Sequence, residues 1–209
     1  LLISQEYAFT STQLAVMTTA QRAALPIPLY PIIGPYPPVP WPPIITLPPI
    51  PLPIDDLSGL TTDQIITLTT TQIAGLSTRA AASLTSTQVG VLTTAQIAAF
   101  TPTNISVFGK EDVQALTSKQ IQTLTTDQIV ALTTAQISAL ATQQAASLTS
   151  TQVAALTTNQ ISAFTPDAVA AFGVNNIKAL FWKQVAALTT LQVAALTTGQ
   201  VAAVSYTHL

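Results

Sequence analysis

The chain has almost none of the side chains that carry chemistry in enzymes. It contains no cysteine, which excludes disulfides, thiolate metal sites and cysteine nucleophiles. Its one histidine, His208, is the penultimate of 209 residues. Charged residues make up only 7% of the chain, against about a quarter in ordinary soluble domains. We therefore expect no enzyme, no cofactor and no metal site.

The few charges are nearly balanced and do not cluster by sign. Six Lys and Arg stand against eight Asp and Glu, which gives a net charge of -2. Duplex nucleic acid is held by clustered basic side chains, and the sequence has no such cluster and no polybasic membrane patch. Asp55-Asp56 and Glu111-Asp112 are the only adjacent acids, and neither pair has metal ligands at a suitable spacing. We expect no nucleic-acid binding and no membrane insertion, and a protein or cell-surface partner if there is one.

The sequence from Leu60 onward is a repeat of eight residues. A large aliphatic residue or phenylalanine recurs at every eighth position as far as Leu196, and the consensus is L-T-T-x-Q-[IV]-x-A. We call each unit an octad and number its positions one to eight. Short repetition of this kind is typical of a solenoid.

A longer repeat of 64 residues is superimposed on the octads. Residues 60–123 align without gaps to residues 124–187, and a third copy starts at Leu188. The irregular octads recur too: Thr101-Pro102 and Thr165-Pro166 are 64 residues apart, and so are the two Phe-Gly pairs at 108 and 172.

Each octad has the pattern of a short capped helix. Thr at position two and Gln at position five have the spacing of a capping box, in which the hydroxyl and the amide each bond the other residue's backbone N–H. We predict helices over positions three to eight that restart at every octad. A β-solenoid and one continuous helix are the alternatives, but seven glycines are few for solenoid corners, and in a continuous helix the Leu stripe would wind around the rod.

The predicted fold class is therefore all-α: a solenoid or superhelix of very short capped helices. A single octad cannot bury enough surface to fold alone, so neighbouring octads must supply the rest of the core. Positions one and six are expected to fill the interior, and the variable position four is expected to face water. The small residue at position eight is expected to let consecutive helices approach closely.

A proline-rich segment interrupts the array at residues 26–56. Thirteen of the fifteen prolines lie between Pro26 and Pro53, which predicts a polyproline II strap or linker. Its aromatics Tyr36 and Trp41 are candidate partner-binding residues. A ligand for an aromatic-lined groove is one interpretation, but the flanking basic residue usual in such ligands is missing. The other is a stiff spacer or a strap whose apolar side chains lie along the first end of the solenoid.

The expected domain organisation follows from these segments. Residues 1–25 hold two octads, FTSTQLAV and MTTAQRAA, at what we take for a fragment edge; residues 57–203 form the solenoid. The last six residues, VSYTHL, resemble the translation of a transposase end sequence used to prepare sequencing libraries. We interpret 204–209 as an adapter-derived tail on a metagenomic fragment, the alternative being a genuine tail.

One octad departs from the consensus with two aromatics. Leu180-Phe181-Trp182-Lys183 places Phe181 and Trp182 where two threonines belong. The two residues are either a partner-binding patch or packing against a neighbouring superhelical turn.

Stretches such as LTTDQIVALTTAQISAL (Leu124 to Leu140) resemble the low-complexity LTxxQ[IV]xAL octapeptide-repeat arrays of very large bacterial surface and exported proteins, often described as adhesin-like. The resemblance covers most of the chain and attaches no site to it. It implies a non-enzymatic structural region, a stalk or spacer with adhesive surfaces, outside the cell or on its surface. The alternative is a cytoplasmic α-solenoid scaffold that binds peptide or protein partners.

Overall fold

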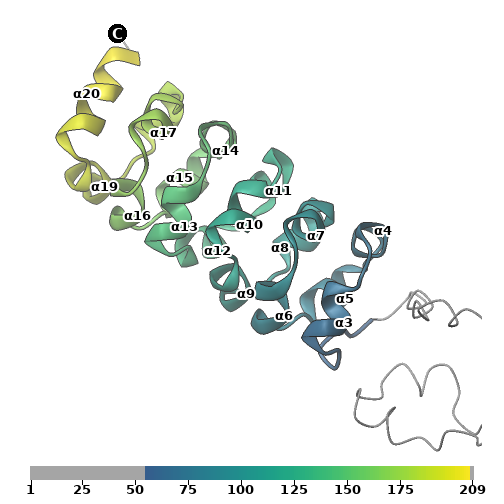
Figure 1. Ribbon diagram of the computed structural model, residues 1–209. Coiled ribbons are helices and arrows are strands. Elements are labelled where there is room, and N and C mark those ends of the chain that lie inside the picture. Colours follow the sequence, from purple (N-terminus) through teal and green to yellow (C-terminus); the bar gives the residue numbers. More distant parts are fainter. Residues whose placement is uncertain (1–54, 208–209) are drawn as a thin grey trace, which may run out of the picture. The chain divides into compact units, whose positions relative to one another are not determined.

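We analysed a computed structural model of the chain, which describes residues 55–207; of residues 205–207 only the backbone is described (Figure 1). The predictions for the octads before residue 25, for the proline-rich segment with Tyr36 and Trp41, and for His208 lie outside the described residues. The described residues belong to one compact unit, which is the octad array.

The described residues form eighteen helices and no strand, which confirms the all-α solenoid and excludes the β-solenoid alternative. In chain order the helices are α3 (Thr62–Ile66), α4 (Thr70–Ala74), α5 (Thr78–Ala82), α6 (Ser86–Val91), α7 (Thr94–Ala99), α8 (Pro102–Ser106), α9 (Lys110–Ala115), α10 (Ser118–Thr123), α11 (Thr126–Ala131), α12 (Thr134–Ala139), α13 (Thr142–Ser147), α14 (Ser150–Ala155), α15 (Thr158–Ala163), α16 (Pro166–Ala170), α17 (Val174–Lys178), α18 (Trp182–Ala186), α19 (Thr190–Ala195) and α20 (Thr198–Thr207).

Every helix begins at position three of its octad, and all but α20 end at position seven or eight. Positions one and two of the octad link successive helices. Both are extended between α6 and α7, with φ −57° and ψ 142° at Leu92 and φ −71° and ψ 158° at Thr93. Two successive extended residues turn the chain sharply between helices. The single continuous helix is thereby excluded as well.

The predicted caps are present. Each Thr or Ser at position two in the described residues accepts a hydrogen bond from the backbone N–H at position five. At α11 this bond is 3.2 Å, and the Gln128 side-chain oxygen accepts from the Thr125 N–H at 2.8 Å. Pro102 and Pro166 occupy the first helical position, where no N–H is needed.

The cap assignment makes a first prediction. Changing Thr125, Thr133 and Thr157 together to alanine should lower the free energy of unfolding by about 1 kcal/mol per site, because each change removes one N-cap bond. Chemical denaturation would measure the loss. The matched control changes the position-three threonines Thr126, Thr134 and Thr158, which are exposed and should cost much less. Equal losses from both triplets would contradict the octad register.

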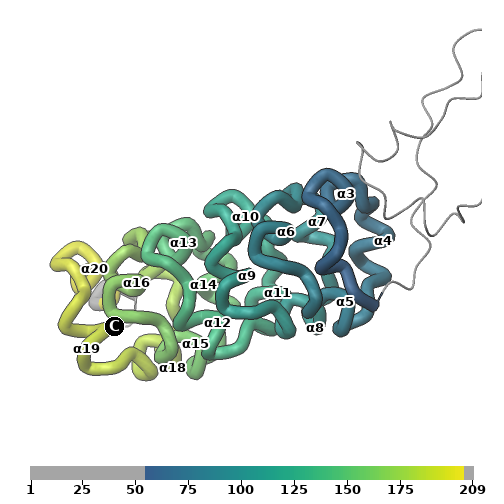
Figure 2. Tube along the Cα trace, turned by 90° about the horizontal axis from the view of Figure 1, so that it is seen from below, coloured from purple at the N-terminus to yellow at the C-terminus, as the bar shows by residue number. Residues whose placement is uncertain are grey.

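Packing between helices differs from the expectation. Consecutive helices are not the main contact partners; each helix packs chiefly on the helix three further along the chain, as α8 on α11, α6 on α9 and α16 on α19. Figures 1 and 2 show the described helices winding in chain order as a stack of turns. The sharp links cause the difference, because they point successive helices in different directions around the superhelix.

The small residues therefore act between turns. A Cβ added to Gly90, at position seven of its octad, would meet the backbone oxygen of Ala115 at 3.5 Å and the Ala115 Cβ at 3.9 Å. Ala115 is at position eight of the octad three further on. Small side chains at position eight allow close approach, as expected, but the surfaces that meet belong to successive turns.

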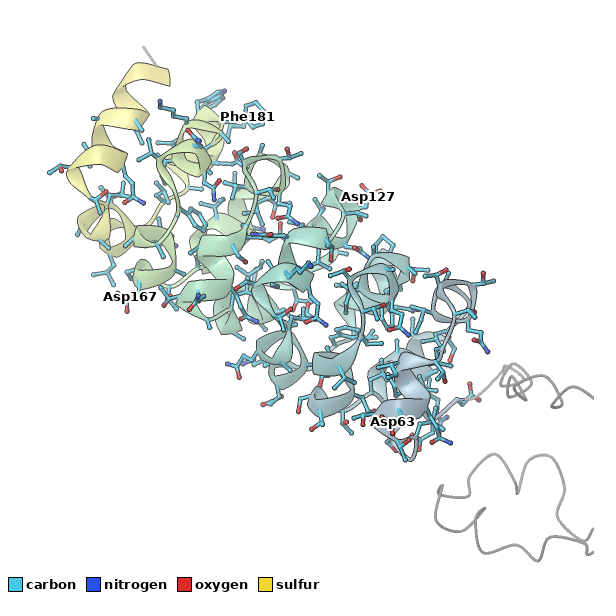
Figure 3. All side chains as sticks on the ribbon, in the orientation of Figure 1. Asp63, Asp127, Asp167 and Phe181 are labelled. Carbon is cyan, nitrogen blue, oxygen red and sulfur yellow. The ribbon has the colours of Figure 1, made fainter. Side chains whose placement is uncertain are left out.

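The core lies where the pattern places it. Positions one and six are buried in every octad from Ile65 to Leu180, and Leu60, which precedes this range, is half-buried. Position four is exposed in every octad. The labelled position-four residues Asp63, Asp127 and Asp167 lie on the outside in Figure 3. The array also reaches back before Leu60, since Leu57 is fully buried at the place of a position-six residue.

The two 64-residue units share one aromatic feature. Phe100 and Phe108 meet edge to face with centroids 5.2 Å apart, and Phe164 and Phe172 repeat this contact at the same distance. All four rings are buried. The four octads headed by Phe have Asn, Asp or Ala at position five instead of Gln. A larger side chain at one core position is thus accompanied by a smaller one at another, as a close-packed interior requires.

Candidate functional site

The most regular polar feature of the solenoid is a row of buried glutamines at position five. We call it the glutamine ladder, and it comprises Gln88, Gln96, Gln120, Gln128, Gln136, Gln144, Gln152, Gln160, Gln184, Gln192 and Gln200. A polar side chain is costly to bury unless its donors and acceptors are all paired.

Gln128 shows how each ladder residue is satisfied. Its side-chain oxygen accepts from the N–H of Thr125, which begins the same helix. Its Nε2 donates to the carbonyl oxygen of Ile97 at 3.0 Å and to that of Phe100 at 2.8 Å. These acceptors precede Gln128 by 31 and 28 residues and lie at a helix C-terminus, where backbone carbonyls lack helical partners. The 1% exposed side chain therefore joins the start of one helix to the end of another in the previous turn.

The 28- and 31-residue spacings recur along the ladder. Gln160 bonds the carbonyls of Ile129 and Leu132, both at 2.8 Å, and Gln192 bonds those of Ile161 and Phe164 at 2.9 and 2.8 Å. Every ladder residue donates to position six of the octad four back and to position one of the octad three back, and most also donate to the neighbouring carbonyl at position seven, 30 residues back. One superhelical turn thus takes between three and four octads.

The role of Gln between turns was not predicted from the sequence, although a signal was present. A capping box accepts Glu as readily as Gln at this position. Thirteen of eighteen octads have Gln there and none has Glu. Only an amide offers both the acceptor for the cap and the two donors for the carbonyls. The exclusion of Glu therefore indicated a second, donor role.

The departures from Gln follow the same geometry. Asn104 and Asn176 are one methylene shorter, and each donates one bond, to the carbonyls of Leu76 and Leu148 at 3.0 and 2.8 Å. Asp112 stands at the equivalent place in the first 64-residue unit to Asn176 in the second. Its Oδ2 accepts from the Gly109 N–H at 2.8 Å, and as a carboxylate it has no hydrogen to donate.

Asp112 has a raised pKa. Burial is the main cause and the nearby Glu111 adds to it, while the bond from Gly109 acts in the opposite direction. The folded chain therefore holds this proton more tightly than the unfolded chain does. The stability that depends on protonated Asp112 is fully present below its ordinary pKa of 3.8 and is lost as the pH rises through the raised folded value.

A second prediction follows for Asp112→Asn. The amide keeps the acceptor for Gly109 and adds a donor, so we expect it to stabilise the fold by about 1 kcal/mol at neutral pH. Denaturation from pH 4 to 8 should show this gain shrinking toward acid, because wild-type Asp112 then becomes protonated. A gain that is the same at both ends of the range would contradict the assignment of the titrating group to Asp112.

The exposed aromatic pair stands apart from the ladder. Phe181 is 63% exposed and Trp182 is 66% exposed, and the Lys183 Nζ lies 5.4 Å from the centre of the Trp182 ring. Phe181 is seen at the edge of the described array in Figure 3. Neither ring packs into the core of a described turn, and the partner-binding role of both residues stays a prediction. Tyr36 and Trp41 lie outside the described residues, and their role as partner-binding residues stays a prediction.

A shallow open depression of about 490 Å³ runs across three successive turns. Its lining is small and uncharged: Ser118, Thr142, Gln143, Ala146, Ser147 and Ala171. Within residues 55–207 no group of three His, Cys, Asp or Glu side chains could hold a metal ion. None of the helices that the structure describes is long and apolar enough to span a bilayer.

Comparison with known proteins supports a repeat region in this chain. Residues 105–142 match the family model of the ALTTAQ repeat. The search of curated proteins gave no match, and the search of solved structures also gave none. The chain thus contains a repeat region whose central part, which includes Gln120, Gln128 and Gln136 of the ladder, is similar to the ALTTAQ repeat.

Proposed function

We propose that this chain is a non-enzymatic structural repeat region, a stalk or spacer with adhesive surfaces, from a large bacterial exported or surface protein. The glutamine ladder is the observation that carries the proposal. Each turn is bonded to the one before by the same contacts, as at Gln128 and Gln160. Such a solenoid gains length without changing its cross-section, which is what a spacer requires.

The exterior suits the same role. Position four, exposed in every octad, carries Asp, Thr, Ala, Asn, Lys and other residues without a pattern of charge. The open depression is lined by hydroxyl, amide and methyl groups, none of which is a general acid or base near neutral pH. A surface without a cluster of charge of one sign supports a structural task.

The adhesive part of the proposal rests on Phe181 and Trp182. A Thr at position two caps its helix, but Phe181 makes no side-chain cap bond, and both rings are largely exposed. This octad thus loses a cap of about 1 kcal/mol and buries little in return. Exposed aromatic side chains are typical anchors of a protein interface.

A cytoplasmic scaffold is the second candidate. The depression over α10 and α13 favours it, because it is open and crosses several turns, as a groove for an extended peptide would. Antibodies against residues 60–187, applied to cells of the source organism, separate the two. Labelling of intact cells is expected for the stalk. Labelling only after permeabilisation would overturn the stalk in favour of the scaffold.

The adhesive surface has its own test. The double change Phe181→Thr and Trp182→Thr restores the consensus and should weaken adsorption of the purified protein to cells by about tenfold, while the melting temperature stays equal or rises. Leu191→Thr is the matched control, because it removes a 70% exposed apolar side chain from position four of the next octad. Equal loss of adsorption in both variants would argue against a specific patch.

A further inference from the structure

One inner place of the glutamine ladder holds a carboxyl group instead of an amide. We propose that Asp112, when it is protonated, donates a hydrogen bond to the carbonyl oxygen of Leu84 in the previous turn, and that this bond breaks when the carboxyl group loses its proton. The junction between these two turns is then a pH-sensitive switch, which is tighter in acid. A stalk and a scaffold would share this junction, so the switch does not depend on the proposed function.

The backbone carbonyls at position one show why a donor is expected here. The fifteen octads headed by residues 60 to 172 each present this carbonyl to the position-five residue 28 further along the chain. In thirteen of them the carbonyl accepts a hydrogen bond from the side-chain amide of that residue. Among the described residues, no group donates to the other two carbonyls, those of Leu84 and Leu140. The residue 28 after Leu140 is Ala168, which has no polar side-chain atom, whereas the residue 28 after Leu84 is Asp112.

The equivalent residue of the second 64-residue unit shows the geometry. Asn176 follows a Phe-Gly pair, as Asp112 does, and its side-chain nitrogen donates to the Leu148 carbonyl at 2.8 Å. Asp112 has a side chain of the same length, and its Oδ2 is held by the Gly109 N–H, which leaves Oδ1 for the Leu84 carbonyl. Two oxygen atoms attract each other only when a hydrogen lies between them. Asp112 therefore needs its proton to make the bond that Asn176 makes at every pH.

Both residues of the junction are removed from water. Asp112 is 8% exposed and Leu84 is 4% exposed. An ionised carboxylate at this place loses hydration and leaves the buried carbonyl without a donor, whereas the protonated form satisfies both groups. Burial accordingly raises the pKa of Asp112. The bond is therefore fully formed below the ordinary pKa of 3.8 and is lost as the pH rises through the raised folded value.

Few charged groups surround Asp112, so the switch depends on the titration of this one carboxyl group. The helices that pack chiefly on α9 are α6 and α12, and neither of these two described helices carries a titratable side chain. On α9 itself Lys110 and Glu111 are exposed, and the Glu111 charge raises the pKa of Asp112 in the same direction as burial does. Of the helices before and after α9 in the chain, α8 carries no titratable side chain and α10 carries the exposed Lys119.

Nuclear magnetic resonance of the full chain tests which group receives the proton. The amide nitrogen of Thr85 is joined to the Leu84 carbonyl, so its chemical shift responds when that oxygen accepts a hydrogen bond. We expect the Thr85 shift to change between about pH 4 and pH 8 with the same midpoint as the carboxyl carbon of Asp112. Thr149, joined to the Leu148 carbonyl, should not change. An Asp112 carboxyl group that titrates without any change at Thr85, or that titrates at its ordinary pKa, would overturn the proposal.

Exchanging the two residues between the units gives matched variants. Asp112→Asn supplies a permanent donor and should abolish the pH response of the Thr85 shift, although Glu111 is still present. Asn176→Asp moves the switch to the second unit, so the Thr149 shift should then titrate. Its urea midpoint should lie below that of wild type at about pH 8 and recover toward it at about pH 4. A Thr85 response that persists in Asp112→Asn, or an equal loss by Asn176→Asp at both pH values, would overturn the proposal.

Discussion

Gln128→Ala is expected to lower the free energy of unfolding by about 3 to 5 kcal/mol, the largest effect of any single change we foresee. The side chain is 1% exposed, so its removal leaves a cavity that water and neighbours do not fill freely. It also removes the bonds of the side chain to the Thr125 N–H and to the carbonyls of Ile97 and Phe100, of which only the Ile97 carbonyl keeps another bond, from the Phe100 N–H. Urea denaturation of wild type and variant measures the difference.

Two further variants separate the ladder from general effects of truncation. Gln143→Ala removes the same side chain from an exposed position four and should cost less than about 0.5 kcal/mol. Gln128→Glu keeps the acceptor for Thr125 but places a carboxylate against two carbonyls, so it should destabilise strongly at neutral pH and less in acid. If Gln128→Ala cost no more than Gln143→Ala, the bonds between turns would not stabilise the fold.

The local structure could be predicted from the sequence because it depends on residues within one octad. Thr125 and Gln128 are three residues apart, and the capping box that they form needs no information from elsewhere in the chain. The same holds for Pro102 at the first helical position and for the burial of positions one and six. The same local interactions recur from octad to octad, so the sequence contains many examples of one pattern.

The packing between turns could not be predicted because it depends on the angle between successive helices. The backbone angles at links such as Leu92 and Thr93 decide whether a helix packs on the helix three further along the chain or on a more distant one. The contact of Gly90 with Ala115 and the bond from Gln128 to Phe100 both depend on this packing of successive turns. The expectation that consecutive helices pack together therefore failed, while the helices themselves were placed correctly.

The candidate site was predicted less completely than the fold. The exposure of Phe181 and Trp182 agrees with a patch, since two aromatics replaced the cap residues without gaining burial. The buried position of Asp112 was not predicted, because the sequence contains no sign that one of the two adjacent acids Glu111 and Asp112 faces the interior. Only the register of the ladder shows that Asp112 occupies a glutamine place and that Glu111, at position four, faces water.

Folding should require a minimum length, and the ladder fixes it. The bonds between turns join residues 28 and 31 apart, so a fragment of three octads such as Leu124 to Ser147 cannot form any of them. Its helices have six residues each, far too few to be stable alone in water. We expect this fragment to be largely disordered by circular dichroism, and residues 60–187 to be helical with a cooperative melt.

Intermediate lengths make the prediction sharper, because each added octad from the fourth onward adds further ladder bonds. Four octads from Leu124 allow the bond from Gln152 to the Leu124 carbonyl, and a fifth octad adds those from Gln160 to Ile129 and Leu132. Helicity per residue should therefore stay low up to three octads and rise steeply from the fourth or fifth. A gradual increase from the first octad would mean that contacts within octads hold the helices. Helicity in the three-octad fragment equal to that of residues 60–187 would show that the ladder is not needed for folding.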